Sequence, residues 1–532
     1  MIASRTLSDL RSAYLLNESI VVADLPDDTR DVVALSAIGE VYGATLGPES
    51  ATVSGLPEGT HVLQALSSSG SVLAEEFFTV RGRRGEDPVP GFVTSFDEAS
   101  RDDVLAWLRD LRCTVVQVYD WMDSYSTALA ESDDYEDPLG RPISRGALES
   151  LIKGIKELGA VAQAYAPVIA AGDDLAGEHP DWRLYRSDGA PESLGDLLQI
   201  MNPGNGEWQA YWIENYGGAA DALGFDGFHL DTYGYPRDAM NVAGEWVDVA
   251  GGYGTFVDVV RRVRHSDVLS FNQVNGVPRG FPAPEPPSFR YVEVWPPNDR
   301  WRHLEGLLER SGNKERQGET LALYPPVWGA GRDLALRTCV LSEAVSTALG
   351  ANVLIWGDND GVLCHPYYVN HETLTRHERE VALRWHRFGL RCRDLFRAAT
   401  DTSWYELSDE NASMKVSWAG ETRPEPAGGS LFARAFRDEH LIVVSLLDLT
   451  GSEDGSWSSG TRRGTCTSAD VEVLIDAPES WSVDVSVLGR DEGRFAPSEY
   501  VEATMREGTG IRVSVPIDEG WSVLRLTPKT PS

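Results

Sequence analysis

The sequence predicts an α/β protein in which a (β/α)8 TIM barrel is flanked by an N-terminal β-sandwich and a C-terminal antiparallel β domain. Short β-branched runs separated by turn residues occupy both ends of the chain, whereas strand and helix patterns alternate between them. The length of 532 residues is also too great for one ordinary domain. We therefore expect three domains, at residues 1–84, 85–398 and 399–532.

The N-terminal part is typical of a small immunoglobulin-like β-sandwich. Its strand candidates are separated by Gly, Pro, Ser and Asp, and they are SIVVADL, DVVALSAI, EVYGATLG, THVLQALSS and VLAEEFFTV. The basic, glycine-containing segment RGRRGEDPVP (81–90) then predicts a linker.

The middle of the chain supplies eight strand candidates in about 300 residues, as a (β/α)8 barrel requires. They lie at 91–96, 114–121, 160–168, 225–231, 267–275, 290–295, 320–327 and 351–358. Helical patterns separate most of them, at 100–111, 143–158, 205–223 and 333–349, with Ser100 and Ser144 as candidate N-caps. The Pro-rich fifth connection, 276–288, has no helical pattern. After a helix at 374–396, alternating runs from KVSWAG to SVLRLT predict the C-terminal β domain.

Charge excludes two classes of partner. The net charge of −35 gives no basic footprint for nucleic acid and would be repelled by an anionic membrane surface. Only five of the 47 basic residues are lysine. Abundant carboxylates with almost no lysine suit a halophilic protein, because concentrated salt screens self-repulsion. An ordinary acidic protein from a GC-rich genome remains the alternative.

The cysteines and the N-terminus carry little chemistry. Five cysteines, odd in number and without CxxC spacing, predict neither a disulfide framework nor a zinc site. The first residues, MIASRTLSDL, contain no apolar signal-peptide core, so a cytoplasmic location is expected unless a leader was removed.

Two carboxyl groups fall where a barrel places its catalytic residues, at the carboxyl ends of strands. The fourth strand candidate ends FDGFHLD, with His229 and Asp231 on one face, and the sixth places Glu293 near its end. Glycosidic cleavage needs one carboxylate and one carboxylic acid on opposite sides of the scissile bond. His229 could orient Asp231 or simply pack in the core. A single acid at a strand end would more often be a capped or solvated side chain.

Aromatic residues at or just past strand ends are a second sign of a sugar site, since flat sugar faces stack on rings. They can equally belong to core and rim packing. They are Tyr119, Trp121, Tyr165, Tyr233, Trp295 and Trp356.

Two further acidic segments are weaker candidates. Asp358, in WGDND, could bind sugar hydroxyls or form a turn. The segment SDDYEDPLG (132–140) lacks EF-hand spacing and is more simply a solvated loop than a calcium site.

Several ordered motifs resemble glycoside hydrolase family 66, which contains dextranases and cycloisomaltooligosaccharide glucanotransferases. They span roughly residues 88–400 and are VVQVYDWMD, DYEDPLGRPIS, AQAYAPV, HPDWRLYRSDGAP, GFDGFHLDTYG, FNQVNG, YVEVW and LCHPYYVN.

The resemblance implies retaining endo-hydrolysis of α-1,6-glucan (dextran or isomaltooligosaccharides) by double displacement. It places the nucleophile at Asp231 and the general acid/base at Glu293. It also implies subsite residues near the cleaved bond, namely Tyr119, Asp120, Trp121, Tyr165, Asn272 and Trp295. Neither a metal nor an organic cofactor is expected, and the partner is an oligo- or polysaccharide; the oligomeric state is left open.

Two other functions remain. A glucanotransferase would pass the glycosyl unit to another sugar, but the cyclising members carry a large inserted carbohydrate-binding module for which the strand spacing here leaves no room. A non-catalytic α-glucan-binding protein would have no use for both carboxylates.

Overall fold

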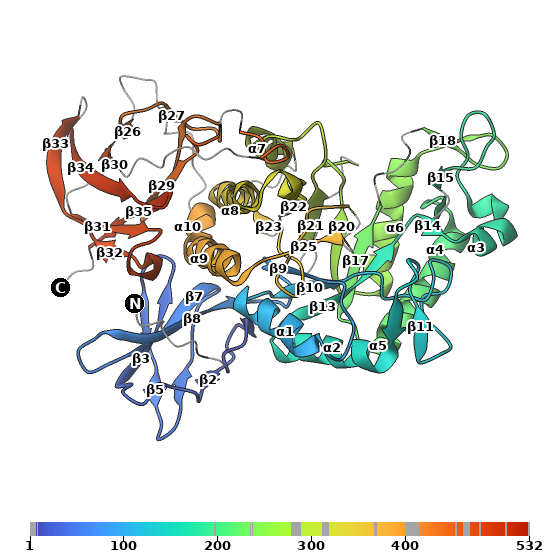
Figure 1. The fold of residues 1–532 in the computed structure, drawn as a ribbon, viewed down its shortest axis with the longest axis horizontal. Coiled ribbons are helices and arrows are strands. Elements are labelled where there is room, and N and C mark those ends of the chain that lie inside the picture. Colours follow the sequence, from blue (N-terminus) through green and yellow to red (C-terminus); the bar gives the residue numbers. More distant parts are fainter. Residues whose placement is uncertain are drawn as a thin grey trace.

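The computed structural model describes residues 7, 9–195, 198–232, 234, 236, 238–265, 267–277, 289–310, 319–366, 370–398, 414–452, 455–460, 469–477, 480–505 and 508–529. The N-terminal β domain, blue in Figure 1, and the C-terminal β domain, red in Figure 1, lie next to each other beside the barrel, and Arg494 of the C-terminal domain pairs with Glu75 of the N-terminal domain at 2.8 Å. Among the described residues no helix is long and apolar enough to cross a membrane.

Eight strands form the barrel sheet, which confirms the predicted fold class. Every pairing along the sheet is parallel, in the order β23-β22-β21-β20-β17-β13-β10-β9. Their residues are almost all buried, as expected for strands covered on both faces. The strands are β9 (Pro90–Val93), β10 (Val115–Val118), β13 (Val161–Pro167), β17 (Gly227–Asp231), β20 (Val268–Asn272), β21 (Phe289–Glu293), β22 (Thr320–Ala322) and β23 (Asn352–Leu354).

A side chain joins the first and last strands of this sheet. Asp358, just beyond β23, accepts hydrogen bonds from the backbone N–H groups of Thr94 and Ser95, just beyond β9, each at 2.7 Å. The carboxylate therefore ties the two edges together at the carboxyl end of the barrel.

Helices follow most of the strands and surround the barrel (Figure 1). They are α1 (Arg101–Asp110), α2 (Arg145–Glu157), α3 (Asp173–Glu178), α4 (Gly206–Trp212), α5 (Gly218–Leu223), α6 (Val249–Val263), α7 (Trp301–Arg310), α8 (Arg332–Ala348), α9 (Arg376–Cys392) and α10 (Leu395–Ala398). A π-helical turn joins α4 to α5, so the predicted helix at 205–223 is continuous. Most of the predicted helix-free connection, 278–288, lies outside the described residues.

The two predicted N-cap residues occupy the N-cap positions, but their side chains do not cap the helices. Ser100 and Ser144 directly precede α1 and α2, yet neither side chain makes a capping hydrogen bond. The Ser100 hydroxyl instead donates to Asp97 at 2.6 Å. A capping bond does form at Asn205, whose side-chain oxygen accepts the N–H groups of Glu207 and Trp208 at the start of α4.

Short hairpins extend the loops at the carboxyl end of the barrel strands. They are β11 (Asp134–Glu136) with β12 (Pro142–Ser144), β14 (Ala170–Ala171) and β15 (Ser193–Leu194) with β16 (Leu198–Ile200), β18 (Ala239–Met240) with β19 (Trp246–Val247), and β24 (Gly361–Val362) with β25 (Glu372–Thr373). The acidic segment 132–140 thus folds as a hairpin, in which Asp137 accepts backbone N–H groups from Leu139 and Arg141.

The N-terminal domain packs two sheets over one apolar core. One sheet has the order β1-β8-β7-β3-β4 and the other β2-β6-β5. The strands are β1 (Ala13–Leu15), β2 (Ile20–Val22), β3 (Asp31–Ser36), β4 (Val41–Gly43), β5 (Thr45–Leu46), β6 (Ala51–Val53), β7 (Gly59–Leu66) and β8 (Val72–Arg81).

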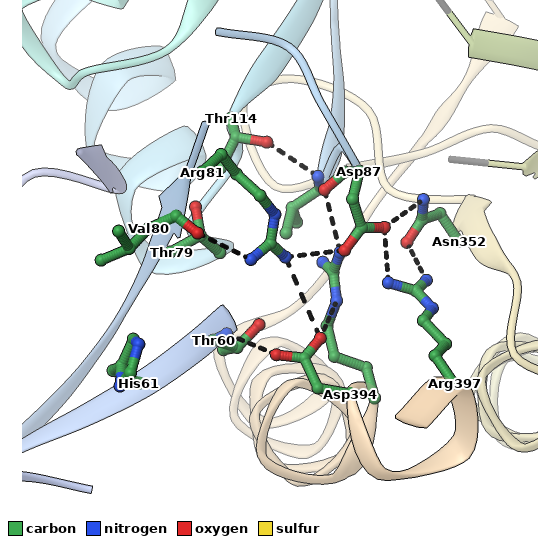
Figure 2. A network of polar contacts seen from close by, with 12 residues as sticks. Thr60, His61, Thr79, Val80, Arg81, Asp87, Thr114, Asn352, Asp394 and Arg397 are labelled. Atoms are coloured by element: carbon green, nitrogen blue, oxygen red, sulfur yellow. Dashed lines mark hydrogen bonds and ion pairs between the residues drawn. The ribbon is translucent and has the colours of Figure 1, made fainter. Parts of the chain in front are cut away.

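The segment 81–90, predicted to be a linker, contains an ionic joint made by Arg81 and Asp87, whose side chains are 9% and 11% exposed (Figure 2). Asp87 forms ion pairs with Arg81 at 2.6 Å and with Arg393 and Arg397, near the end of the last barrel helices, at 2.6 and 2.5 Å. Burial would raise the pKa of Asp87, but the three guanidinium groups hold that pKa well below its usual range. Its charge therefore locks the N-terminal domain to the barrel.

The C-terminal domain is a second pair of sheets. Their orders are β26-β30-β34-β33 and β27-β28-β29-β35-β31-β32, and a separate apolar core lies between them. The strands are β26 (Met414–Ser417), β27 (Thr422–Arg423), β28 (Leu431–Arg437), β29 (Ile442–Asp448), β30 (Ala469–Ile475), β31 (Trp481–Val487), β32 (Ala496–Pro497), β33 (Tyr500–Met505), β34 (Gly508–Ile517) and β35 (Trp521–Pro528). Trp521 packs on Phe388 of α9, so this domain also rests on the barrel.

Candidate active site

Three neighbouring strands end in the residues that define the site. Asp231 is the last residue of β17, Asn272 the last of β20 and Glu293 the last of β21. Because these strands are parallel neighbours, their ends meet at one edge of the barrel. The amide nitrogen of Asn272 donates to Oδ1 of Asp231 at 2.8 Å and to Oε2 of Glu293 at 3.0 Å.

The shared amide sets an upper limit on the separation of the two carboxyl groups. Oδ1 of Asp231 and Oε2 of Glu293 cannot be farther apart than the sum of their hydrogen-bond lengths to the amide nitrogen of Asn272. That sum is about 6 Å. An amide NH2 directs its protons roughly 120° apart, which gives about 5 Å between the oxygens. One small group therefore fits between the carboxyl groups, and both can reach the same bond of a substrate.

Asp231 is held as an acceptor from three directions. Its Oδ1 also accepts the backbone N–H of Thr232 at 2.8 Å, and its Oδ2 accepts the hydroxyl of Tyr165 at 2.9 Å. Only 6% of Asp231 is exposed. Three donors stabilise the negative charge of this carboxylate and fix its orientation.

Glu293 is partly exposed and accepts from a different set of donors. Its Oε2 accepts the indole N–H of Trp295 at 3.3 Å as well as the amide of Asn272, and its Oε1 accepts the hydroxyl of Tyr324 at 2.8 Å. The rings of Trp295 and Tyr324 stack at 5.0 Å with an interplanar angle of 7°.

Burial and the nearby charge of Asp231 raise the pKa of Glu293 to about 7, against the opposing effect of its donors. Glu293 therefore keeps its proton up to near-neutral pH. A stabilised carboxylate beside a carboxyl group with a raised pKa is the pairing that nucleophilic and general acid catalysis require.

His229 lies one layer below Asp231 and does not bond to it in the described contacts. Its Nδ1 is 2.9 Å from the hydroxyl of Ser270, which donates to Gln163 at 3.0 Å, so Nδ1 carries the proton. Burial lowers the pKa of His229 to about 3, which keeps the ring neutral. The described hydrogen bonds to Asp231 come instead from Tyr165, Asn272 and the adjacent backbone.

The residues of the YDWM motif (119–122), which follows β10, differ in how they are placed relative to the site. The ring of Tyr119 lies 3.9 Å from that of Tyr165, the donor to Asp231. Trp121 is fully buried, and its indole N–H donates to the carbonyl of Tyr165 at 2.9 Å. Tyr119 thus contacts the donor to Asp231 and is 8% exposed, whereas Trp121 has no face open to a ligand.

Asp120 is the unusual member of that motif. It is 1% exposed, has a positive φ of 49°, and its Oδ1 has no hydrogen-bond partner. Burial raises the pKa of Asp120 to about 8; Arg141 lowers it, and the charges of Asp137 and Asp231 add to the rise. Asp120 is therefore protonated at neutral pH and able to donate, in a strained backbone conformation of the kind that clusters at functional sites.

Two other predicted binding residues, Trp356 and Asp358, each have a polar atom bonded within the protein, although Oδ1 of Asp358 has no hydrogen-bond partner. The indole of Trp356 donates to Glu343 of α8 at 3.0 Å and the residue is 4% exposed, which puts it among the outer helices. Asp358 is 1% exposed and its Oδ2 joins β9 to β23, as described above. Tyr233 lies outside the described residues.

Sequence reasoning missed two tyrosines. Tyr324 follows β22 by two residues and bonds to Glu293. Tyr291 precedes Glu293 by two residues on the same face of β21, and its ring packs edge-on against His229 at 4.5 Å. The available signals were the place of Tyr324 within the seventh predicted strand, 320–327, and the position of Tyr291 two residues before Glu293. Among the described residues no cluster of His, Cys, Asp and Glu could hold a metal ion.

Comparison with known proteins shows which family the chain resembles. The profile of glycosyl hydrolase family 66 matches residues 79–524. Two cycloisomaltooligosaccharide glucanotransferases of Niallia circulans are each 25% identical to this chain, over 249 and 256 residues. These matches cover 42% and 43% of this chain but 26% of each relative, so the chain spans a minor part of the curated relatives that it matches.

A solved structure extends the likeness over the whole fold. The cycloisomaltooligosaccharide glucanotransferase of a Paenibacillus sp., complexed with cycloisomaltoheptaose, has a TM-score of 0.81 and 15% identity, over 97% of this chain and 98% of that one. The shared fold and the extent of the profile match, with two carboxyl groups at the barrel mouth, lead to one conclusion: the chain belongs to glycosyl hydrolase family 66.

Proposed function

We propose that this protein is a retaining endo-glycosidase that hydrolyses α-1,6-glucan by double displacement. The observation that carries the proposal is the single amide of Asn272 bonded to both Asp231 and Glu293. It keeps the carboxyl oxygens at about the 5–5.5 Å of retaining enzymes and well below the roughly 6.5–9.5 Å that inverting enzymes need for an intervening water. The α-1,6 linkage rests on family membership alone.

In the proposed mechanism the scissile bond lies over the barrel mouth. Protonated Glu293 gives its proton to the leaving oxygen while Oδ1 or Oδ2 of Asp231 attacks the anomeric carbon, which forms a glycosyl ester and inverts that centre. Glu293, now ionised, takes a proton from water. The water opens the ester and inverts the centre again, so that the configuration is retained and Glu293 regains its proton.

Glucanotransfer is the second candidate, and the names of the relatives favour it about as well. It uses the same ester of Asp231, with a sugar hydroxyl in place of water as the group that Glu293 deprotonates. Hydrolysis and glucanotransfer therefore differ only in the group that accepts the glycosyl unit, and the same two carboxyl groups can catalyse both reactions.

Product analysis tests both candidates. The protein is incubated with dextran, isomaltooligosaccharides of defined length and α-1,4-glucan, in low and molar KCl. Linear isomaltooligosaccharides and new reducing ends support hydrolysis, whereas cyclic or elongated products support transfer. If the protein bound dextran but formed no products, both candidates would be excluded and a carbohydrate-binding protein would remain.

Azide rescue tests the two roles directly. With an aryl α-isomaltoside, whose leaving group needs no acid, Glu293→Gln should form the glycosyl ester and azide should then yield an α-glycosyl azide. Asp231→Asn, which lacks a nucleophile, should give a β-glycosyl azide or no product. The opposite pairing of products would reverse the assignments, and normal turnover by either variant would exclude its residue.

A further inference from the structure

A row of four side chains, which we call the hairpin ridge, crosses the loops at the carboxyl end of the barrel. Pro191 pairs with Tyr185, Tyr185 with Met240, and Met240 with Trp246, each across an antiparallel bridge. Residues directly opposite each other in antiparallel strands point to the same face of a sheet. Because adjacent strands lie about 4.8 Å apart, the ridge is about 14 Å long. Figure 1 shows β15 and β18 side by side at this place.

The opposite face of these strands packs on the barrel. Leu184 and Ala239, which directly precede Tyr185 and Met240, are fully buried, and Val247 packs on the same apolar core. Period-two alternation therefore turns the ridge away from the core. The backbones of Tyr185 and Met240 exchange two N–H···O hydrogen bonds of 2.8 Å, which hold the two loops together. The ridge is thus the outer face of a fixed layer of backbone.

Trp246 is exposed to an extent that packing does not explain. It is 65% exposed, the highest value among the large hydrophobic residues in the described ranges. Other barrel tryptophans, such as Trp208 and Trp212, are fully buried and donate their indole N–H groups to backbone carbonyls. The turn before Trp246 is fixed, because the side-chain oxygen of Asn241 accepts the backbone N–H of Glu245 at 3.0 Å. A fixed turn that presents a large ring to solvent is typical of a binding surface.

The ridge is continuous with the candidate active site. Its first two residues lie in the segment after β13, the strand that supplies Tyr165, and its last two lie in the segment after β17, which ends at Asp231. The backbone N–H of Val168 donates to the carbonyl of Asp231 at 3.0 Å, so the two segments leave the barrel side by side. Loops that follow barrel strands surround the mouth. A sugar chain that leaves the carboxyl pair on this side of the mouth therefore runs toward the ridge.

We propose that the hairpin ridge is a remote subsite that binds a glucan chain beyond the residues that cleave it. The proposal rests on the proposed function. Hexose rings have apolar C–H faces, which stack on the rings of Trp246 and Tyr185. A glucan is also neutral, so the net charge of −35 does not repel it, whereas an anionic ligand would be repelled. The ridge would therefore favour long chains over short ones.

A second copy of the chain is the other occupant to test against. A stable protein interface buries about 800 Å² on each partner and involves roughly 20–30 residues a side. The ridge offers four residues, and two copies of the chain would bring like charges together. These observations favour a sugar chain as the occupant.

The dependence of KM on substrate length tests the proposal. Wild type and Trp246→Ala are compared on isomaltotriose, on longer isomaltooligosaccharides and on dextran. Loss of the stacked ring should raise the KM for dextran roughly 3- to 10-fold relative to the KM for isomaltotriose, with kcat for dextran unchanged. The effect should grow with chain length, and Trp246→Phe, which keeps a ring, should recover part of it. Val41→Ala, at a position 63% exposed in the N-terminal domain, should leave the KM ratio unchanged.

Three results would overturn the proposal: no change in the KM for dextran, an equal change at every substrate length, or a wild-type dimer in size-exclusion chromatography that Trp246→Ala abolishes. Affinity electrophoresis in dextran with Asp231→Asn, with and without Trp246→Ala, measures binding without turnover. If the wild type left every α-glucan unchanged, the proposed function would fail. If it acted on dextran but Trp246→Ala weakened neither binding nor KM, only the ridge would be excluded.

Discussion

Replacing Asn272 by alanine is the most direct perturbation of the site, because one amide group serves both carboxyl groups. The variant loses the N–H donors at 2.8 Å to Asp231 and 3.0 Å to Glu293, and it also loses the Oδ1 that accepts the backbone N–H of Glu293 at 3.1 Å. A hydrogen bond to a charged group contributes about 1.5–3 kcal/mol, and the bond to a half-protonated Glu293 contributes less.

These values give a loss of about 3–4 kcal/mol in transition-state stabilisation, or roughly 100- to 1000-fold in kcat/KM. Because the amide of Asn272 lowers the pKa of Glu293, that pKa should rise above about 7 in Asn272→Ala, and the basic limb of the profile should move up. Initial rates on an isomaltooligosaccharide across the pH range measure both effects.

A matched asparagine variant separates function from stability. Asn205→Ala removes the N-cap of α4, which should lower stability by about 1 kcal/mol and leave kcat/KM unchanged. If Asn272→Ala lost less than about fivefold in kcat/KM and its basic limb did not move, the bridging role would be refuted. The loss of two charge-assisted hydrogen bonds should have a larger effect on kcat/KM than that.

Four further outcomes follow from the structure. Wild-type kcat/KM should fall on the basic side with a midpoint near pH 7, where Glu293 loses its proton, and a midpoint above pH 9 would contradict this assignment. Asp87→Asn should cost about 3–5 kcal/mol in urea unfolding. Because the pKa of Asp87 is lowered by folding, its contribution is present above the unfolded value of about 4 and fades as pH falls, so wild type and variant should converge in acid. Trp356→Phe should lower the melting temperature without changing KM, since its indole is bonded to Glu343. With a net charge of −35, stability should rise from low to molar KCl, and a flat melting series would exclude halophilic adaptation.

Periodicity in the sequence determined the barrel and the level of the two acids. Alternation of strand and helix patterns predicts parallel strands, and parallel strands end at a common edge. Period-two spacing then placed Asp231 and Glu293 at the ends of β17 and β21, where the structure has them. Asn272 was named from the family motif, and its spacing did not show that it bridges both acids.

Tertiary packing decided the rest of the site, because a pattern along one strand does not show which way a side chain turns once the strand has ended. Trp121 and Trp356 were expected near substrate because they lie at strand ends. The side chain of Trp121 instead packs in the core, and that of Trp356 bonds to Glu343 of α8. Tyr324 sits at an equivalent place after β22 and turns inward to Glu293.

A pattern along the chain also does not show which groups will surround a buried carboxylate. Asp87 lies in a segment that predicts a linker, but the folded chain brings three arginines to its carboxylate. Asp358 lies in a segment that predicts a sugar-binding turn, but the folded chain brings two backbone N–H groups to it. The sequence by itself therefore determined the fold, the positions of Asp231 and Glu293 at strand ends, and the family. Only the tertiary structure decided which neighbours set their protonation, because those neighbours are far apart along the chain and meet only when the barrel closes.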